Sequence, residues 1–122
     1  MKKLAVVLTT PPLSSLTNTA INYIKCALEE GITIVGVFFY QDGVLNASKS
    51  ISIPSDEYQT MNAWRDLHLT YNLPLHICIT AAEKRGLSDD EDIGNNISEL
   101  FTISGLGELV ELSAQADRVV QM

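Results

Sequence analysis

The chain has 122 residues, 46% of them hydrophobic, and its 15 acidic against 8 basic side chains give a formal net charge of −7. At this length folding buries about two-thirds of the surface of the unfolded chain, so we expect one domain over residues 1–122, stable without disulfides or metal. The acidic balance argues against tight binding to nucleic acid or to anionic lipid, because both need a basic face.

The first apolar run, Leu4–Leu8, is far too short for a membrane span or for the apolar core of a signal peptide. It predicts a buried strand, and its shortness indicates a cytoplasmic protein. Two cysteines, Cys26 and Cys78, lie far apart in the chain. Their spacing is not that of a metal site, and in a reducing cytoplasm we expect two free thiols.

Beyond this strand, the first half of the chain predicts a helix and a second strand. An apolar stripe of helical period follows the cap candidates Ser14 and Ser15 and is closed by Gly31. Residues 32–40 are rich in β-branched and aromatic side chains, which is typical of a strand. The polar stretch 44–54 has no clear period and predicts a long loop at the end of that strand.

The middle of the chain predicts a helix, a strand and a helical turn. Ser55, Asp56 and Glu57 form a candidate cap for a helix that continues to Tyr71. Residues 73–80 alternate in the manner of a strand, with His76 and Cys78 on one face, and a helical turn follows. Cys78 is therefore expected near a strand-to-helix junction.

The last third predicts three helical segments and a final strand. Residues 88–91 match a capping box at a helix start, and residues 97–101 indicate a short helix. Residues 106–114 predict an amphipathic helix and residues 118–120 a strand. Because strands alternate with helices, we predict an α/β fold: a three-layer sandwich in which a mostly parallel sheet carries helices on both faces.

Cys78 is the strongest candidate for chemistry. A thiol at the carboxyl end of a parallel strand, where a helix begins, lies near the positive end of the helix dipole, which favours the thiolate. Lys84 and Arg85 follow within two helical turns and add positive potential if they fold back toward the sulfur. The alternative is that Cys78 is a small buried hydrophobic residue.

Other kinds of cysteine chemistry do not fit this stretch. A phosphatase loop needs an arginine six positions after the cysteine, where this chain has Lys84, and no Cys-x-x-Cys pair is present. Cys26 lies within the first predicted helix, so we interpret it as a packing residue. His76 lies too far along the strand for a direct hydrogen bond to Cys78 and is interpreted as a half-buried strand histidine. After these exclusions, the sequence is left with one candidate nucleophile, the thiol of Cys78.

Three separated motifs carry a resemblance to a known family. They are Val37–Val44, Ile77–Gly86, and the ending that runs from Phe101–Gly107 through Ala116–Val120. In this order they resemble the DsrE/TusD-like sulfur-relay family, whose fold is DsrE-like and flavodoxin-like. The cysteine that carries a persulfide in that family matches Cys78, and the resemblance assigns no role to Cys26 or His76.

The resemblance implies a cytoplasmic sulfurtransferase that assembles with TusB- and TusC-like chains into a heterohexamer. Sulfur would come from a TusA-like donor and pass to a TusE-like acceptor, for the 2-thiolation of wobble uridine in tRNA. No cofactor, whether metal or nucleotide, is needed for such a relay, which uses one exposed thiolate. The acidic charge predicts that the protein acts through protein partners and does not itself bind tRNA.

Two alternatives stay open from the sequence. One is a subunit of a related DsrEFH-like sulfur-oxidation complex, which shares the motifs and the cysteine. The other is a non-catalytic assembly subunit, in which Cys78 is buried and inert.

Overall fold

The computed structural model describes residues 2–90 and 94–122. It has one five-stranded sheet in the order β4-β3-β2-β1-β5, and every neighbouring pair of strands is parallel. The strands are β1 (Lys3–Leu8), β2 (Thr33–Phe39), β3 (Leu75–Cys78), β4 (Thr102–Ser104) and β5 (Arg118–Gln121). The helices are α1 (Ser15–Glu29), the 3-10 helix η1 (Gln41–Ala47), α2 (Thr60–Tyr71), α3 (Ile79–Lys84) and α4 (Leu106–Gln115).

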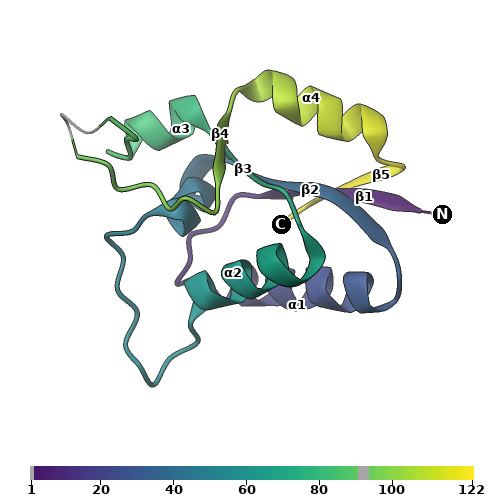
Figure 1. Ribbon diagram of the computed structural model, residues 1–122, viewed down its shortest axis with the longest axis horizontal. Coiled ribbons are helices and arrows are strands. Elements are labelled where there is room, and N and C mark those ends of the chain that lie inside the picture. Colours follow the sequence, from purple (N-terminus) through teal and green to yellow (C-terminus); the bar gives the residue numbers. More distant parts are fainter. Residues whose placement is uncertain (1, 91–93) are drawn as a thin grey trace.

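The elements form three layers, as the alternation of strands and helices predicted. Figure 1 shows α1 and α2 side by side on one face of the sheet and α4 on the other. The central strands β1 and β2 are almost entirely buried between these layers, which explains their continuous aliphatic and aromatic sequences. Among the described helices, none is both long and apolar enough to cross a membrane.

The boundaries of α1 follow the sequence signals closely. The Ser14 hydroxyl caps the first turn by accepting a hydrogen bond from the Leu16 amide at 3.2 Å. Beyond the last turn, Gly31 takes a φ of 83°, which suits the residue that reverses the chain into β2. This part of the prediction is confirmed.

The loop predicted over residues 44–54 is wrong in its first part, which belongs to η1. The polar residue Asn46 is fully buried there: its amide donates to the carbonyls of Gly43 and Thr10, and its oxygen accepts from the Trp64 indole at 3.0 Å. Val44 is also buried. The polar side chain of Asn46 can be buried because all of its hydrogen bonds are made within the protein, and two of its three partners, Thr10 and Trp64, are distant in the sequence.

The predicted cap at Ser55–Glu57 is also wrong, because α2 begins only at Thr60. Gln59 precedes the helix and donates its side-chain amide to the carbonyls of Ile53, Pro54 and Glu57. These bonds hold the chain in a compact turn up to residue 59, so the helix starts one turn later than the Ser-Asp-Glu signal suggested.

Residues 88–90 of the capping-box sequence are not helical, and its last member, Glu91, lies outside the described residues. The Ser88 hydroxyl accepts a hydrogen bond from the Asp90 amide at 3.0 Å in an irregular segment. Asn96 organises this segment instead, since its side chain accepts from the Ser88 amide and donates to the Gly86 carbonyl. Competing side-chain bonds of this kind favour turns over helices.

The short helix predicted over residues 97–101 is replaced by an isolated bridge followed by a turn, in which the Phe101 amide donates to the Ser98 carbonyl at 3.2 Å. Ile97 forms an isolated antiparallel bridge with Ser48, and the edge strand β4 follows directly after Phe101. The Phe101 ring packs edge-on against Phe39 with the ring centroids 5.1 Å apart. The apolar side chain of Phe101 therefore anchors the segment that leads into β4 against the end of β2, and does not form the buried face of a helix.

Candidate functional site

Cys78 lies at the junction of a strand and a helix, as predicted. It is the last residue of β3 and the N-cap residue of α3, where its side chain makes no capping hydrogen bond. The strand is shorter than the predicted 73–80, because the helix begins already at Ile79. In the sheet Cys78 is paired with Ser104 of β4. The junction lies at the carboxyl edge of the sheet, where parallel α/β folds build their sites.

The thiol is covered and not exposed, contrary to what a sulfur relay led us to expect. Only 1% of the Cys78 surface is accessible in the isolated chain. The residue nevertheless lines a pocket of about 280 Å³ that is open to solvent on one side. Its other lining residues are Tyr40, Gln41, Thr80, Ala81, Lys84, Arg85 and Leu106.

The two basic residues of the motif, Lys84 and Arg85, both line the pocket of Cys78. They differ in how they are held. The Arg85 guanidinium is 2.9 Å from a carboxylate oxygen of Asp42 and donates to the Ala81 carbonyl at 3.0 Å. Lys84 makes no ion pair with any described residue. Among the described residues, Lys84 is therefore the basic side chain of the pocket that has no carboxylate within ion-pair distance.

His76 has its own partners on the α4 face of the sheet. Its Nδ1 atom is 3.0 Å from the Ser104 hydroxyl and its Nε2 atom is 3.6 Å from a Glu108 carboxylate oxygen. The side chain is 14% exposed, and among the described residues no hydrogen bond links it to Cys78. The interpretation as a half-buried strand histidine is confirmed. His76 thereby joins β3, β4 and the first turn of α4 beside the pocket.

Several lining residues were missed by the sequence reasoning. Tyr40 and Gln41 follow β2, the neighbour of β3, so their position was available in principle from the rule that parallel strands end at one edge. Leu106 is the first residue of α4, the helix that follows β4 in the chain. Its place beside Cys78 depends on strand order, which no local signal in the sequence provides.

Cys26, predicted to be a packing residue, is exposed on α1. The helical stripe that meets the sheet runs through its neighbours Ile24 and Ala27, both of which are buried. Cys26 therefore falls between two core positions and faces outward. The two thiols therefore lie in different environments: Cys78 lines a pocket, and Cys26 lies on the exposed surface of a helix.

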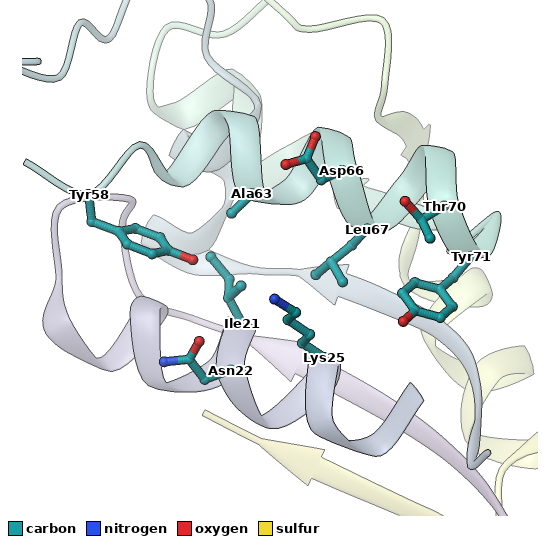
Figure 2. Close-up of a pocket in the computed structure, with 9 residues that line it drawn as sticks. All are labelled: Ile21, Asn22, Lys25, Tyr58, Ala63, Asp66, Leu67, Thr70 and Tyr71. Atoms are coloured by element: carbon teal, nitrogen blue, oxygen red, sulfur yellow. The ribbon is translucent and has the colours of Figure 1, made fainter. Parts of the chain in front are cut away.

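A larger cavity, of about 480 Å³, lies between α1 and α2 on the opposite face of the sheet. Figure 2 shows the Lys25 side chain reaching between the two helices, with Tyr58 and Tyr71 at opposite ends of the cavity. Partial burial, and secondly the charge of Asp66, raise the pKa of Tyr58 above its ordinary value. None of the nine lining residues is a cysteine or a histidine, so the larger cavity contains no thiol.

Within residues 2–90 and 94–122, no three His, Cys, Asp or Glu side chains come together in a group that could hold a metal ion.

Comparison with known proteins identifies the family. The model of the DsrE/DsrF-like family matches residues 2–122. Proteins named Sulfurtransferase TusD from Klebsiella pneumoniae subsp. pneumoniae and Cronobacter sakazakii are 38% and 39% identical over 110 residues, and the alignments cover 85% of this chain and 86% of each relative. A Salmonella paratyphi B protein of the same name is 40% identical over the same coverage.

A solved structure confirms the architecture. The crystal structure of the ychN protein from E. coli superposes with a TM-score of 0.80 over the whole of both chains, at 23% sequence identity, and thus shows a shared fold. The predictions of an α/β fold, of the family and of a sulfurtransferase are confirmed by these findings together. With a family match over nearly its whole length and named relatives near 40% identity, the chain belongs to the DsrE/DsrF-like family.

Proposed function

We propose that residues 1–122 form a single sulfurtransferase domain that accepts sulfane sulfur on Cys78 as a persulfide and passes it to a downstream carrier protein. The observation that carries the proposal is the position of this thiol, at a strand-to-helix junction and in the wall of a pocket that also contains Lys84. The family membership and the name of the relatives support the same assignment.

The transfer needs only thiolate and persulfide chemistry. The Cys78 thiol first gives its proton to solvent, and the thiolate attacks the outer sulfur of a donor persulfide. A new bond forms between Cys78 Sγ and that sulfur, the sulfur–sulfur bond of the donor breaks, and the donor leaves as a thiolate with the electron pair. A thiolate of the acceptor repeats the step on the Cys78 persulfide and restores the Cys78 thiolate, so no external oxidant or reductant is consumed.

Lys84 favours this chemistry electrostatically. A cation that lines the pocket attracts an anionic donor persulfide into it. Arg85 forms an ion pair with Asp42 and donates a hydrogen bond to the Ala81 carbonyl. We therefore assign it a structural role, which is to hold the start of η1 against α3.

A second candidate is favoured by the burial of Cys78. A thiol that is only 1% exposed suits an assembly subunit whose cysteine is inert, as well as a carrier that reacts only with a thiol or persulfide inserted into its pocket. The two candidates differ in one measurable property. A carrier acquires sulfur on Cys78 from a protein persulfide donor, and an inert subunit does not.

For the wider pathway we propose the relay suggested by the family resemblance. The protein works in the cytoplasm, receives sulfur from a TusA-like donor, and serves the 2-thiolation of tRNA wobble uridine through a TusE-like acceptor. TusB- and TusC-like subunits complete the assembly. Leu106 and Val110, which lie one helical turn apart on α4 and are exposed by 53% and 68%, support burial of this helix by a partner subunit.

The cellular test is complementation of a strain that lacks the corresponding gene. We expect the wild-type chain and Cys26→Ser to restore 2-thiouridine in tRNA, measured by nucleoside mass spectrometry, and Cys78→Ser to fail while still accumulating to wild-type levels. Full restoration by Cys78→Ser would favour the assembly subunit. Restoration of sulfur oxidation without any change in tRNA would favour the DsrEFH-like alternative.

A further inference from the structure

Gln41 follows β2 at the edge of the Cys78 pocket, and its backbone has a conformation that glutamine seldom adopts. Its φ is 51°, in the left-handed region, where a side chain crowds the neighbouring carbonyl. Among the described residues the other non-glycine position with positive φ is Asn72, a residue type that tolerates it well. Residues held in such conformations are concentrated at functional sites.

An ion pair holds the residue after Gln41. The Asp42 carboxylate is 2.9 Å from Arg85, which also donates to the Ala81 carbonyl at 3.0 Å. The start of η1 is thereby tied to α3, the helix that begins at Cys78. The segment that carries Gln41 is therefore fixed to the element that carries the thiol.

A close backbone contact holds the next position. A Cβ atom at Gly43 would lie 2.1 Å from the carbonyl oxygen of Leu8, so the chain passes directly against the end of β1. The Gly43 amide also donates to the Tyr40 carbonyl at 2.9 Å and closes a tight turn around Gln41. Because both sides of the turn are fixed, Gln41 cannot reach an ordinary conformation by a small shift.

Gln41 is an exposed residue that lines the same pocket as Cys78, and its carboxamide makes no hydrogen bond with any described residue. A primary amide offers two N–H donors, which bind anions without adding charge. We propose that Gln41 is a sulfur-binding residue: its amide N–H donates to the outer sulfur of the Cys78 persulfide. This inference rests on the function proposed above and specifies which group of the pocket holds the transferred atom.

The role follows from where charge resides during the transfer. When the donor reacts as its persulfide anion, the outer sulfur keeps its negative charge as it bonds to Cys78 Sγ and the donor leaves as a thiolate, so the new persulfide is anionic. A hydrogen bond from Gln41 stabilises this anion, while Lys84 supplies the general positive potential. The two groups thus act on the same sulfur in different ways, one directional and one electrostatic.

The test uses the full chain and glutathione persulfide as the sulfur donor. Gln41→Gly removes the amide and accepts the positive φ without strain, whereas Gln41→Met keeps the length of the side chain and its strain but has no donor. Asn72→Gly is the matched control, since it changes the other left-handed residue, at the end of α2. The rate of sulfur loading is followed by intact mass, and the rate of Cys78 alkylation by iodoacetamide is measured in parallel.

We expect both Gln41 variants to load sulfur roughly tenfold more slowly than wild type, the loss that follows from one hydrogen bond to a charged group. Alkylation by iodoacetamide should stay unchanged, because that reaction transfers no outer sulfur. Wild-type loading rates in both variants would overturn the inference, and so would an equal loss in alkylation, which would mean a distorted pocket. Failure of the proposed function itself appears differently, as a wild-type chain that acquires no sulfur on Cys78.

Discussion

Cys78 is covered by its neighbours, so its reactivity depends on the groups that surround the opening of its pocket. Lys84 and Arg85 are adjacent in sequence and line the same pocket, yet they are held in different ways. Arg85 has a carboxylate partner in Asp42, whereas Lys84 has none among the described residues. Lys84 should therefore govern how strongly the pocket attracts an anion, and Arg85 should govern its shape.

This difference predicts the response to a charged reagent. Relative to neutral iodoacetamide, the alkylation of Cys78 by anionic iodoacetate should slow roughly threefold in Lys84→Met, because one nearby positive charge is lost. Lys84→Arg should retain the wild-type ratio. The two rates are measured by peptide mass spectrometry at low ionic strength. An unchanged ratio in Lys84→Met would show that the ammonium group does not attract anions into the pocket.

Tyr58 provides a pH-dependent prediction on the other face of the sheet. Burial, and then the charge of Asp66, raise its pKa above the ordinary 10.0, so the folded state holds the phenol proton more tightly than the unfolded state. The free energy of unfolding should therefore fall as the pH rises from about 10 toward the folded-state pKa of Tyr58. Tyr58→Phe should remove this part of the alkaline loss, measured by urea denaturation between pH 9 and 11. If the free energy of unfolding falls equally steeply with pH in Tyr58→Phe and in wild type, Tyr58 is not the group responsible.

At the scale of elements, the sequence predicted those parts whose signals are local. The Ser14 cap and Gly31 define α1, and the apolar runs define β1 and β2. The junction at Cys78 was predicted for the same reason. Signals failed where the partners are distant: the buried Asn46 depends on Trp64 and Thr10, and the capping sequence at Ser88 is overridden by Asn96. The strand order that brings Leu106 to the pocket is likewise non-local.

The tight packing of η1 against β1 predicts a specific stability effect. Gly43→Ala would place a methyl group 2.1 Å from the Leu8 carbonyl oxygen, which belongs to the backbone and cannot move aside cheaply. We expect the free energy of unfolding to drop by about 3 kcal/mol. Gly107→Ala is the matched control: it lies in α4 with open space around it and should stabilise the protein by up to about 1 kcal/mol. If chemical denaturation shows equally small changes in the free energy of unfolding for both variants, Gly43 is not in close contact with the Leu8 carbonyl.

The whole molecule carries a net charge of −7, and this charge limits what it binds directly. A relay subunit that serves tRNA thiolation should meet proteins and not the tRNA itself. We expect no saturable binding of fluorescently labelled tRNA by anisotropy, even at low salt where phosphate contacts are strongest. Saturable binding that weakens steeply with added salt would mean that the protein presents a basic surface to the phosphates of the tRNA.

The most direct test of the account is to locate the transferred sulfur. The full chain is incubated with a cysteine desulfurase, cysteine and a TusA-like donor, and is then alkylated and mapped by peptide mass spectrometry. The account predicts one additional sulfur atom on the peptide that contains Cys78, none on the Cys26 peptide, and complete loss of the adduct in Cys78→Ser. Sulfur on Cys26, or equal labelling of the Cys78→Ser chain, would contradict it.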